Sequence, residues 1–151
     1  MARSEKERAQ EERAEKERAL AANVAFYAAF STSNLAAMDA LWSTTRDVAV
    51  FHPNWQGIKG RDAVMRSWAT ILNGAEMADI RPVGARVILS GKMAMVICEE
   101  DLVAIRMIAT NIFMNEGGTW RIVHHQATRL PEAVPNPTEN KGQKGQPSSG
   151  R

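Results

Sequence analysis

The sequence predicts an α+β domain in which a curved antiparallel sheet wraps around N-terminal helices to form a cone. Between residues 20 and 73, apolar side chains recur at helical spacing on both sides of one short strand. Between residues 77 and 129, they follow a period of two or form solid apolar runs, which is typical of strands. Helices followed by several long consecutive strands indicate helices packed on one face of an antiparallel sheet.

The first 18 residues form a charged arm. Residues 4–18 alternate Glu with Lys and Arg and contain only Ala as apolar side chains, so we expect a helix with nothing to bury. Pairs such as Glu12 and Lys16 support it locally. Larger residues at heptad positions, which a coiled coil would need, are absent from this stretch. The arm is either a solvated helix or a segment that binds a partner.

Two helices are expected next. From Leu20 to Phe30 the first helix gains a broad apolar surface and belongs to the core. Residues 31–34 interrupt it, and Asn34 can cap a second, short helix. One face of that second helix is apolar and comprises Leu35, Met38, Leu41 and Trp42.

Residues 48–72, VAVFHPNWQGIKGRDAVMRSWATIL, predict a strand, a turn and a third helix. The β-branched and aromatic residues at 48–51 favour a buried strand. Pro53 lacks a backbone donor and pushes the preceding residue toward extended geometry, so we expect the strand to stop with His52 at the rim of the space it lines. Gly60 can begin the following helix, whose apolar stripe directs Trp68 into the same space.

Four long strands should follow, at residues 77–89, 92–103, 105–114 and 119–129. Hairpin turns are predicted at 90–91 and 116–118, where Gly residues occur. From residue 131 the chain consists mainly of Pro, Asn, Gly, Gln, Lys and Ser, which cannot support a core. We therefore divide the chain into the arm, a domain at 19–130 and a disordered tail at 131–151.

Composition excludes several classes of function. The net charge is +2, and the basic residues of the arm are interleaved with acids, so nucleic acid binding is not expected. The single cysteine, Cys98, excludes an intramolecular disulfide and lies in an apolar run typical of a buried thiol. The sequence has no membrane-length apolar run and no hydrophobic centre of a secretory signal. We expect a cytoplasmic protein that does not bind membranes.

The known catalytic motifs are also missing. The sequence contains no Ser-His-Asp or Cys-His arrangement, phosphate loop or dinucleotide fingerprint. A zinc or iron site needs three converging ligands, whereas the adjacent His124 and His125 should point to opposite faces of a strand. We expect neither a metal nor a cofactor.

The last strand supplies the candidate site. By strict alternation Trp120, Ile122, His124 and Gln126 share the face that we assign to the cavity. His124 would then face His52 across a space bordered by Asn111, Trp42, Trp55 and Trp68. Two imidazoles beside an amide could perform acid/base chemistry on a bound carbonyl compound, with His52 as base and His124 or Asn111 orienting the carbonyl. The alternatives are histidines bonded to a backbone carbonyl or to Glu99 or Glu100, and aromatic residues that only fill the core.

Two strings, FHPNWQGIKGRDAVMRSWATIL and TNIFMNEGGTWRIVHHQAT, resemble the SnoaL-like or NTF2-like superfamily, and the resemblance covers about residues 21–131. It implies the cone-shaped fold of ketosteroid isomerases, polyketide cyclases and association domains. In the isomerases an aspartate before a proline is the base, and His52 stands there. Their oxyanion tyrosine and acid fall near Phe26 and Asn111, with Tyr27 one step away. Because Phe26 cannot donate a hydrogen bond, steroid isomerisation is not expected.

Two hypotheses remain. The first is a homodimer whose cone binds a small, mainly apolar organic molecule, with cofactor-independent chemistry of isomerase, lyase or cyclase type. The second is a non-catalytic association module with a filled cone, whose outer face would carry Arg121, Val123, His125, Ile108, Ile112 and Met114. Residues proposed to bind the ligand are Phe26, Tyr27, Trp42, Trp55, Trp68, Phe113 and Trp120.

Overall fold

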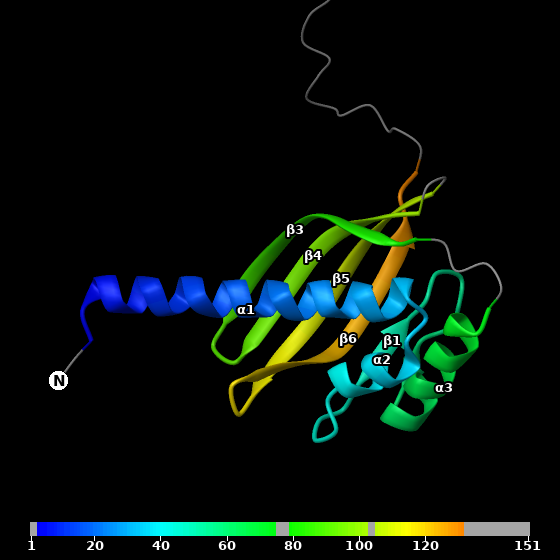
Figure 1. Ribbon diagram of the computed structural model, residues 1–151, viewed down its shortest axis with the longest axis horizontal. Coiled ribbons are helices and arrows are strands. Elements are labelled where there is room, and N and C mark those ends of the chain that lie inside the picture. The colour runs from blue at the N-terminus through cyan, green and yellow to red at the C-terminus, as the bar shows by residue number, and fades with distance from the viewer. Residues whose placement is uncertain (1–2, 75–78, 103–104, 132–151) are drawn as a thin grey trace, which may run out of the picture.

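A long helix crosses one face of a curved sheet, and two shorter helices lie near the C-terminal end of this long helix (Figure 1). The structure is a computed structural model that describes residues 3–74, 79–102 and 105–131. The predicted α+β class is confirmed. The helices are α1 (Glu5–Ser31), α2 (Leu35–Leu41) and α3 (Arg61–Leu72). The strands are β1 (Ala49–Phe51), β2 (Ile58–Lys59), β3 (Arg81–Ser90), β4 (Met93–Asp101), β5 (Arg106–Glu116) and β6 (Thr119–Arg129).

The strands form one sheet in the order β2-β1-β6-β5-β4-β3. Strands β3 to β6 pair antiparallel with their chain neighbours, while β1 adds to β6 in parallel. Gly117 and Gly118 have φ values of 63° and 93°, a region that favours glycine and lets β5 turn tightly into β6. Strand β2 lies where the sequence indicated only a turn, because its two residues are too few for a periodic signal.

Helix α1 begins at a capping box and continues through the predicted end of the arm without a break. The Ser4 hydroxyl accepts from the Glu7 amide, and the Glu7 carboxylate accepts from the Ser4 amide. Glu15 attaches the helix to the sheet by accepting from the Trp120 indole at 3.0 Å. Asn34 caps α2 through the Ala37 amide, as predicted. No helix among the described residues is long and apolar enough to span a membrane.

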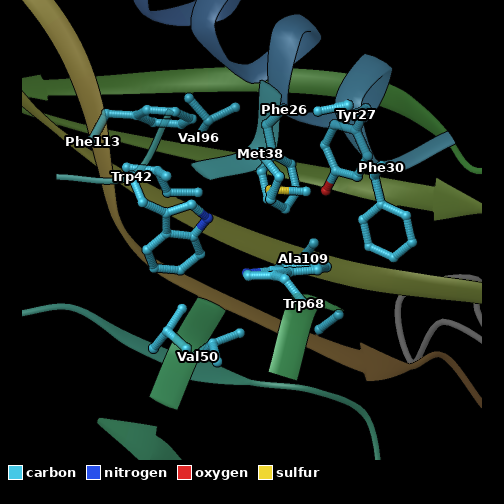
Figure 2. Close-up of a cluster of buried hydrophobic side chains, with 14 of the residues drawn as sticks. Phe26, Tyr27, Phe30, Met38, Trp42, Val50, Trp68, Val96, Ala109 and Phe113 are labelled. Carbon is cyan, nitrogen blue, oxygen red and sulfur yellow. The ribbon is translucent and has the colours of Figure 1, made fainter. Parts of the chain in front are cut away.

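The space between α1 and the sheet is filled with large side chains (Figure 2). Trp42 and Trp68 are at most 1% exposed, and their rings lie 6.4 Å apart. Phe26 meets the Trp68 ring edge-to-face at 5.5 Å. These side chains therefore fill much of the interior of the cone. The large side chains involved are Phe26, Tyr27, Phe30, Met38, Trp42, Trp68 and Phe113.

Some predicted boundaries cannot be compared with the structure. The start of the first long strand at residues 77–78, the end of the second at residue 103 and the tail from residue 132 lie outside the described residues. Where the structure does describe them, β3, β4, β5 and β6 agree with the predicted strands to within a few residues.

Candidate functional site

A cavity of about 220 Å³ lies between the end of α1, the end of α3 and strands β4 to β6. We call it the inner cavity. Its wall is mostly apolar, and its titratable side chains are His52, Glu100 and His125. A largely apolar hollow with a few convergent polar groups is the usual form of a small-molecule site. The remaining lining residues are Phe30, Pro53, Trp55, Ile71, Ile80, Leu102, Met107 and Ala127.

A β-bulge in β6 decides which histidine faces this cavity. Ile112 of β5 pairs with His124, but the next residue, Phe113, pairs with Ile122. Val123 is therefore an extra residue in β6. One inserted residue reverses the alternation of side chains in the rest of the strand.

The bulge turns His125 inward. His125 is 2% exposed and stands opposite Asn111, which is fully buried on the inner side of β5. Its ring centroid lies 6.4 Å from that of His52 and 5.6 Å from that of Trp68. The position predicted for one imidazole across from His52 is thus occupied by His125.

The prediction that His124 faces the interior is wrong. The His124 ring lies 5.8 Å from the Phe51 ring and lines a hollow on the outer side of the sheet, together with Lys59 and Ile112. Partial burial lowers its pKa. The error arose because strict period two was assumed through the bulge.

Glu100 is the acidic group of the inner cavity. Its side chain is 2% exposed, and its Oε1 accepts a hydrogen bond from the Tyr27 hydroxyl at 2.8 Å. Burial raises the pKa of Glu100 to about 7, although the Tyr27 bond opposes this effect by stabilising the carboxylate. Glu100 therefore changes protonation near neutral pH, which suits a group that both takes and returns a proton.

Asn111 fixes the tautomer of His125. Its amide Nδ2 donates to Asn23 Oδ1 at 2.8 Å and to the Tyr27 hydroxyl at 3.2 Å. Its Oδ1 is consequently the acceptor in the 2.6 Å contact with His125 Nδ1, so Nδ1 carries the hydrogen. His125 Nε2 keeps its lone pair and lies 4.0 Å from Glu100 Oε1.

His125 is a neutral imidazole at neutral pH. Burial lowers its pKa to about 3, and repulsion from His52 and His124 adds to the effect. The contact between His125 and Glu100 is therefore not an ion pair at neutral pH. It is a neutral imidazole acceptor facing a carboxyl group whose pKa is raised by burial.

His52 lies in the cavity wall but is already engaged. Its Nε2 lies 2.9 Å from the Ser67 hydroxyl, which donates to the Val64 carbonyl at 2.7 Å. Because that hydroxyl hydrogen is used, Nε2 is the donor and Nδ1 keeps the lone pair of His52. Burial lowers the pKa of His52 to about 4, and Trp68 meets its ring edge-to-face at 4.7 Å.

The other predicted site residues are divided between the cavity and the core. Trp55 lines the cavity and is 44% exposed. Asn111 and Tyr27 lie behind it and hold His125 and Glu100. Five predicted ligand-binding residues pack in the core without lining the inner cavity: Phe26, Trp42, Trp68, Phe113 and Trp120.

Sequence reasoning did not select Glu100 or His125 for the cavity, although both left a signal. Glu100 continues the inward series of Ala94, Val96 and Cys98, so an acid occupies an apolar face. In β6, the apolar residues Trp120 and Ile122 occupy even positions, whereas Ala127, the apolar residue further along, occupies an odd one. This indicates that the alternation of inward and outward side chains shifts by one residue before Ala127. Across the described residues, no three His, Cys, Asp or Glu side chains converge as metal ligands.

The helices and the curved sheet define an NTF2-like α+β cone whose inner cavity holds a buried carboxyl–imidazole pair. The chain belongs to the SnoaL-like domain family, which matches residues 19–131. This confirms the resemblance seen in the sequence. None of the curated proteins matches the chain.

Solved structures show the same fold. A proposed dehydratase of the NTF2-like family from Streptomyces avermitilis is 27% identical, with a TM-score of 0.72 over 79% of this chain and 98% of that one. A proposed calcium/calmodulin-dependent protein kinase type II association domain from Thiobacillus denitrificans is 30% identical, with a TM-score of 0.65 over 74% and 94%. A proposed ketosteroid isomerase from Parabacteroides distasonis, 16% identical over 68% and 80%, has a TM-score of 0.57 and shares the fold alone.

Proposed function

We propose that the inner cavity binds a small, mainly apolar organic molecule and transfers protons on it without a cofactor, in a reaction of isomerase, lyase or cyclase type. One observation carries the proposal: Glu100, with a pKa raised to about 7, lies 4.0 Å from the bare Nε2 of His125 in an apolar cavity. Groups with pKa values near the operating pH are the most effective acid/base catalysts. A dehydratase-like relative at 27% identity is compatible with this class.

The two groups would act as an acid and a base at once. His125 Nε2 takes a proton from a carbon next to a carbonyl, while the protonated Glu100 gives its proton to the carbonyl oxygen. The C–H bond breaks, its electron pair forms the carbon–carbon double bond, and an enol results. Glu100 becomes an anion as His125 becomes a cation, so each stabilises the charge on the other. In an unsaturated substrate, His125 gives its proton to a different carbon while the enol O–H returns its proton to Glu100, and an isomer results. In a β-hydroxy substrate, His125 instead gives its proton to the hydroxyl, which leaves as water while the enol O–H returns its proton to Glu100, and an unsaturated carbonyl compound results.

The supporting residues have positioning roles. Tyr27 holds one oxygen of Glu100, and Asn111 keeps the hydrogen of His125 on Nδ1. His52 was expected to be the base. We now propose that His52 shapes the cavity, because Ser67 occupies its Nε2, whereas the bare Nε2 of His125 lies 4.0 Å from Glu100 Oε1.

Exchange of α-protons for deuterium tests this function, because enolisation is common to the proposed reactions. The probes are 1-indanone and 2-tetralone in D2O, followed by proton NMR. The parent should accelerate exchange of at least one ketone, and Glu100→Gln and His125→Gln should each reduce the rate about 100-fold or more. The matched control is His124→Gln, since that neighbouring histidine lies on the outer side of the sheet. Equal exchange in the parent and both variants would remove the catalytic roles assigned here.

Association is the second candidate function, and the outer face of the sheet favours it. Ile88, Met95 and Ile112 lie side by side across β3, β4 and β5, and Ile88 is 56% exposed. Contiguous exposed apolar surface is characteristic of interfaces. A relative named as an association domain is 30% identical to this chain. We propose a homodimer through this face, in a cytoplasmic setting. His125, which was expected there, lies inside, and His124 takes its place on the outer side.

The dimer has a direct test. Ile88→Lys places a charge in the middle of the proposed interface, so light scattering should show the parent as a dimer and the variant as a monomer at micromolar concentration. Arg66→Gln on the exposed side of α3 is the control and should remain dimeric. A parent that is monomeric under these conditions would rule out this interface.

A further inference from the structure

A second hollow adjoins the inner cavity. It has a volume of about 380 Å³, and its lining includes His52, Pro53, Trp55 and Ala127, which also line the inner cavity. We call it the vestibule. Since four residues belong to both walls, a ligand longer than the inner cavity would extend into the vestibule.

The vestibule differs from the inner cavity in chemistry. Its wall adds the polar side chains of Asn54, Gln126, Thr128 and Arg129. Arg129 is its cationic residue, and it takes part in none of the salt bridges found among the described residues. The inner cavity instead ends at the acid Glu100. The vestibule therefore presents a positive charge to a bound molecule, whereas the inner cavity presents an acid that is neutral when it serves as the proton donor.

The register of β6 directs Arg129 to the cavity side. Arg129 stands opposite Met107 in the β5–β6 ladder, and Met107 lines the inner cavity. Directly opposite residues of an antiparallel pair point to the same face of a sheet. Arg129 also follows His125 and Ala127 at a spacing of two, so these three side chains project from one face.

Backbone groups add to the polarity of the vestibule. On the edge of β6 that faces away from β5, Trp42 forms a bridge with Ile122, and β1 pairs with residues 124–126. Strand β1 ends at Phe51, which is the partner of Gln126. Among the described residues no strand pairs with residues 127–129 on that side. Alternate N–H and C=O groups of an unpaired strand edge are free to bond a ligand.

We infer that the molecule bound by this site is an organic anion, with an apolar, carbonyl- or hydroxyl-bearing body in the inner cavity and a carboxylate against Arg129 in the vestibule. This inference rests on the proposed function and specifies its substrate class. The reverse orientation would bury the carboxylate in the mostly apolar inner cavity, away from Arg129, where it would lose its hydration without gaining a cationic partner. The position of Arg129 thus sets the direction in which the substrate enters.

Two probes that differ only in a carboxylate test the inference: 2-naphthol and 6-hydroxy-2-naphthoate. Both offer a fused apolar ring and a hydroxyl for His125 Nε2, and their fluorescence reports binding. The parent should bind the carboxylate about fivefold or more tightly, as expected for a charge-assisted bond. In Arg129→Gln the ratio of the two Kd values should fall to about one, while Arg129→Lys should retain a large part of the preference. Arg66→Gln, on α3, is the matched control and should behave as the parent.

Salt gives a second readout, because the preference should shrink with rising ionic strength in the parent and stay flat in Arg129→Gln. If both probes bind with equal Kd, or if Arg129→Gln leaves the preference unchanged, the inference is overturned and the proposed function stands. If neither probe binds the parent at millimolar concentration, small-molecule binding in the inner cavity is itself overturned.

Discussion

Glu100 shows how one residue acquires a function from its surroundings. Its neighbour Glu99 points to the other face of β4, where it pairs with Arg106. The Glu100 side chain lies on the inner face of the same strand, where it is buried and no longer hydrated by bulk water. Two adjacent, chemically identical side chains therefore have different surroundings, because strand geometry places Glu99 on the outer face of the sheet and Glu100 in an apolar cavity.

Tyr27→Phe tests the control of Glu100 by its hydrogen bond. The Tyr27 hydroxyl stabilises the carboxylate, so its removal should raise the pKa of Glu100 by about one unit above its present value near 7. The carboxyl carbon shift in a 13C NMR titration measures this change. Any proton-exchange activity should move to higher pH by the same amount. A Glu100 pKa that stays the same or falls would show that Tyr27 does not donate to the carboxylate.

At the scale of elements, the strand of β6 was predictable, but the position of its bulge was not. The apolar alternation predicted a strand at residues 119–129, as the structure shows. The extra residue, Val123, depends on how β5 aligns with β6, and a single strand carries no information about its partner's register. The predicted positions of His124 and His125 are therefore the reverse of those in the structure, where His125 lies inside and His124 on the outer side. His52 is a contrasting case, since Pro53 constrains it locally, and the structure places it in the cavity wall as expected.

The turn between β1 and β2 is held by close packing at Gly57. A Cβ at this position would come within 2.2 Å of the Phe51 ring. Gly57→Ala should therefore displace the ring and lower the free energy of unfolding by about 1–2 kcal/mol, as overpacking does. Urea denaturation measures the loss. The same substitution in a Phe51→Leu background should cost clearly less, since the aromatic ring is gone. An equal cost in both backgrounds would locate the strain elsewhere.

For the whole molecule, periodicity predicted the layers but not the filling of the cone. Helical and strand-like repeats are local properties, so α1, α3 and β3 to β6 could be placed from the sequence. Whether Phe26, Trp42 and Phe113 surround a cavity or fill it depends on how their rings fit together in three dimensions. The structure shows them packed, and the open space lies instead between His52, Glu100 and His125.

The buried titratable groups make the stability of the whole chain depend on pH in two opposite directions. The raised pKa of Glu100 means that the folded state keeps a proton that the unfolded state has lost. Its stabilising contribution is complete below pH 4.5 and is lost as pH rises through about 7. The pKa values of His52 and His125 are lowered to about 4 and 3, so stability is lost as pH falls below 6.5.

Stability should therefore be greatest near pH 7, where the opposing slopes of the two effects cancel. Between pH 6 and pH 9, the ionisation of buried Glu100 should cost about 1.4 kcal/mol. Urea denaturation of the parent and of Glu100→Gln at several pH values separates this contribution, because the amide cannot ionise and still accepts from Tyr27. Between pH 6 and pH 9, the variant should gain about 1.4 kcal/mol of stability relative to the parent. Parallel profiles for the two proteins would mean that Glu100 ionises as freely in the folded chain as in the unfolded one, and the acid/base pair would then have no group that titrates near neutrality.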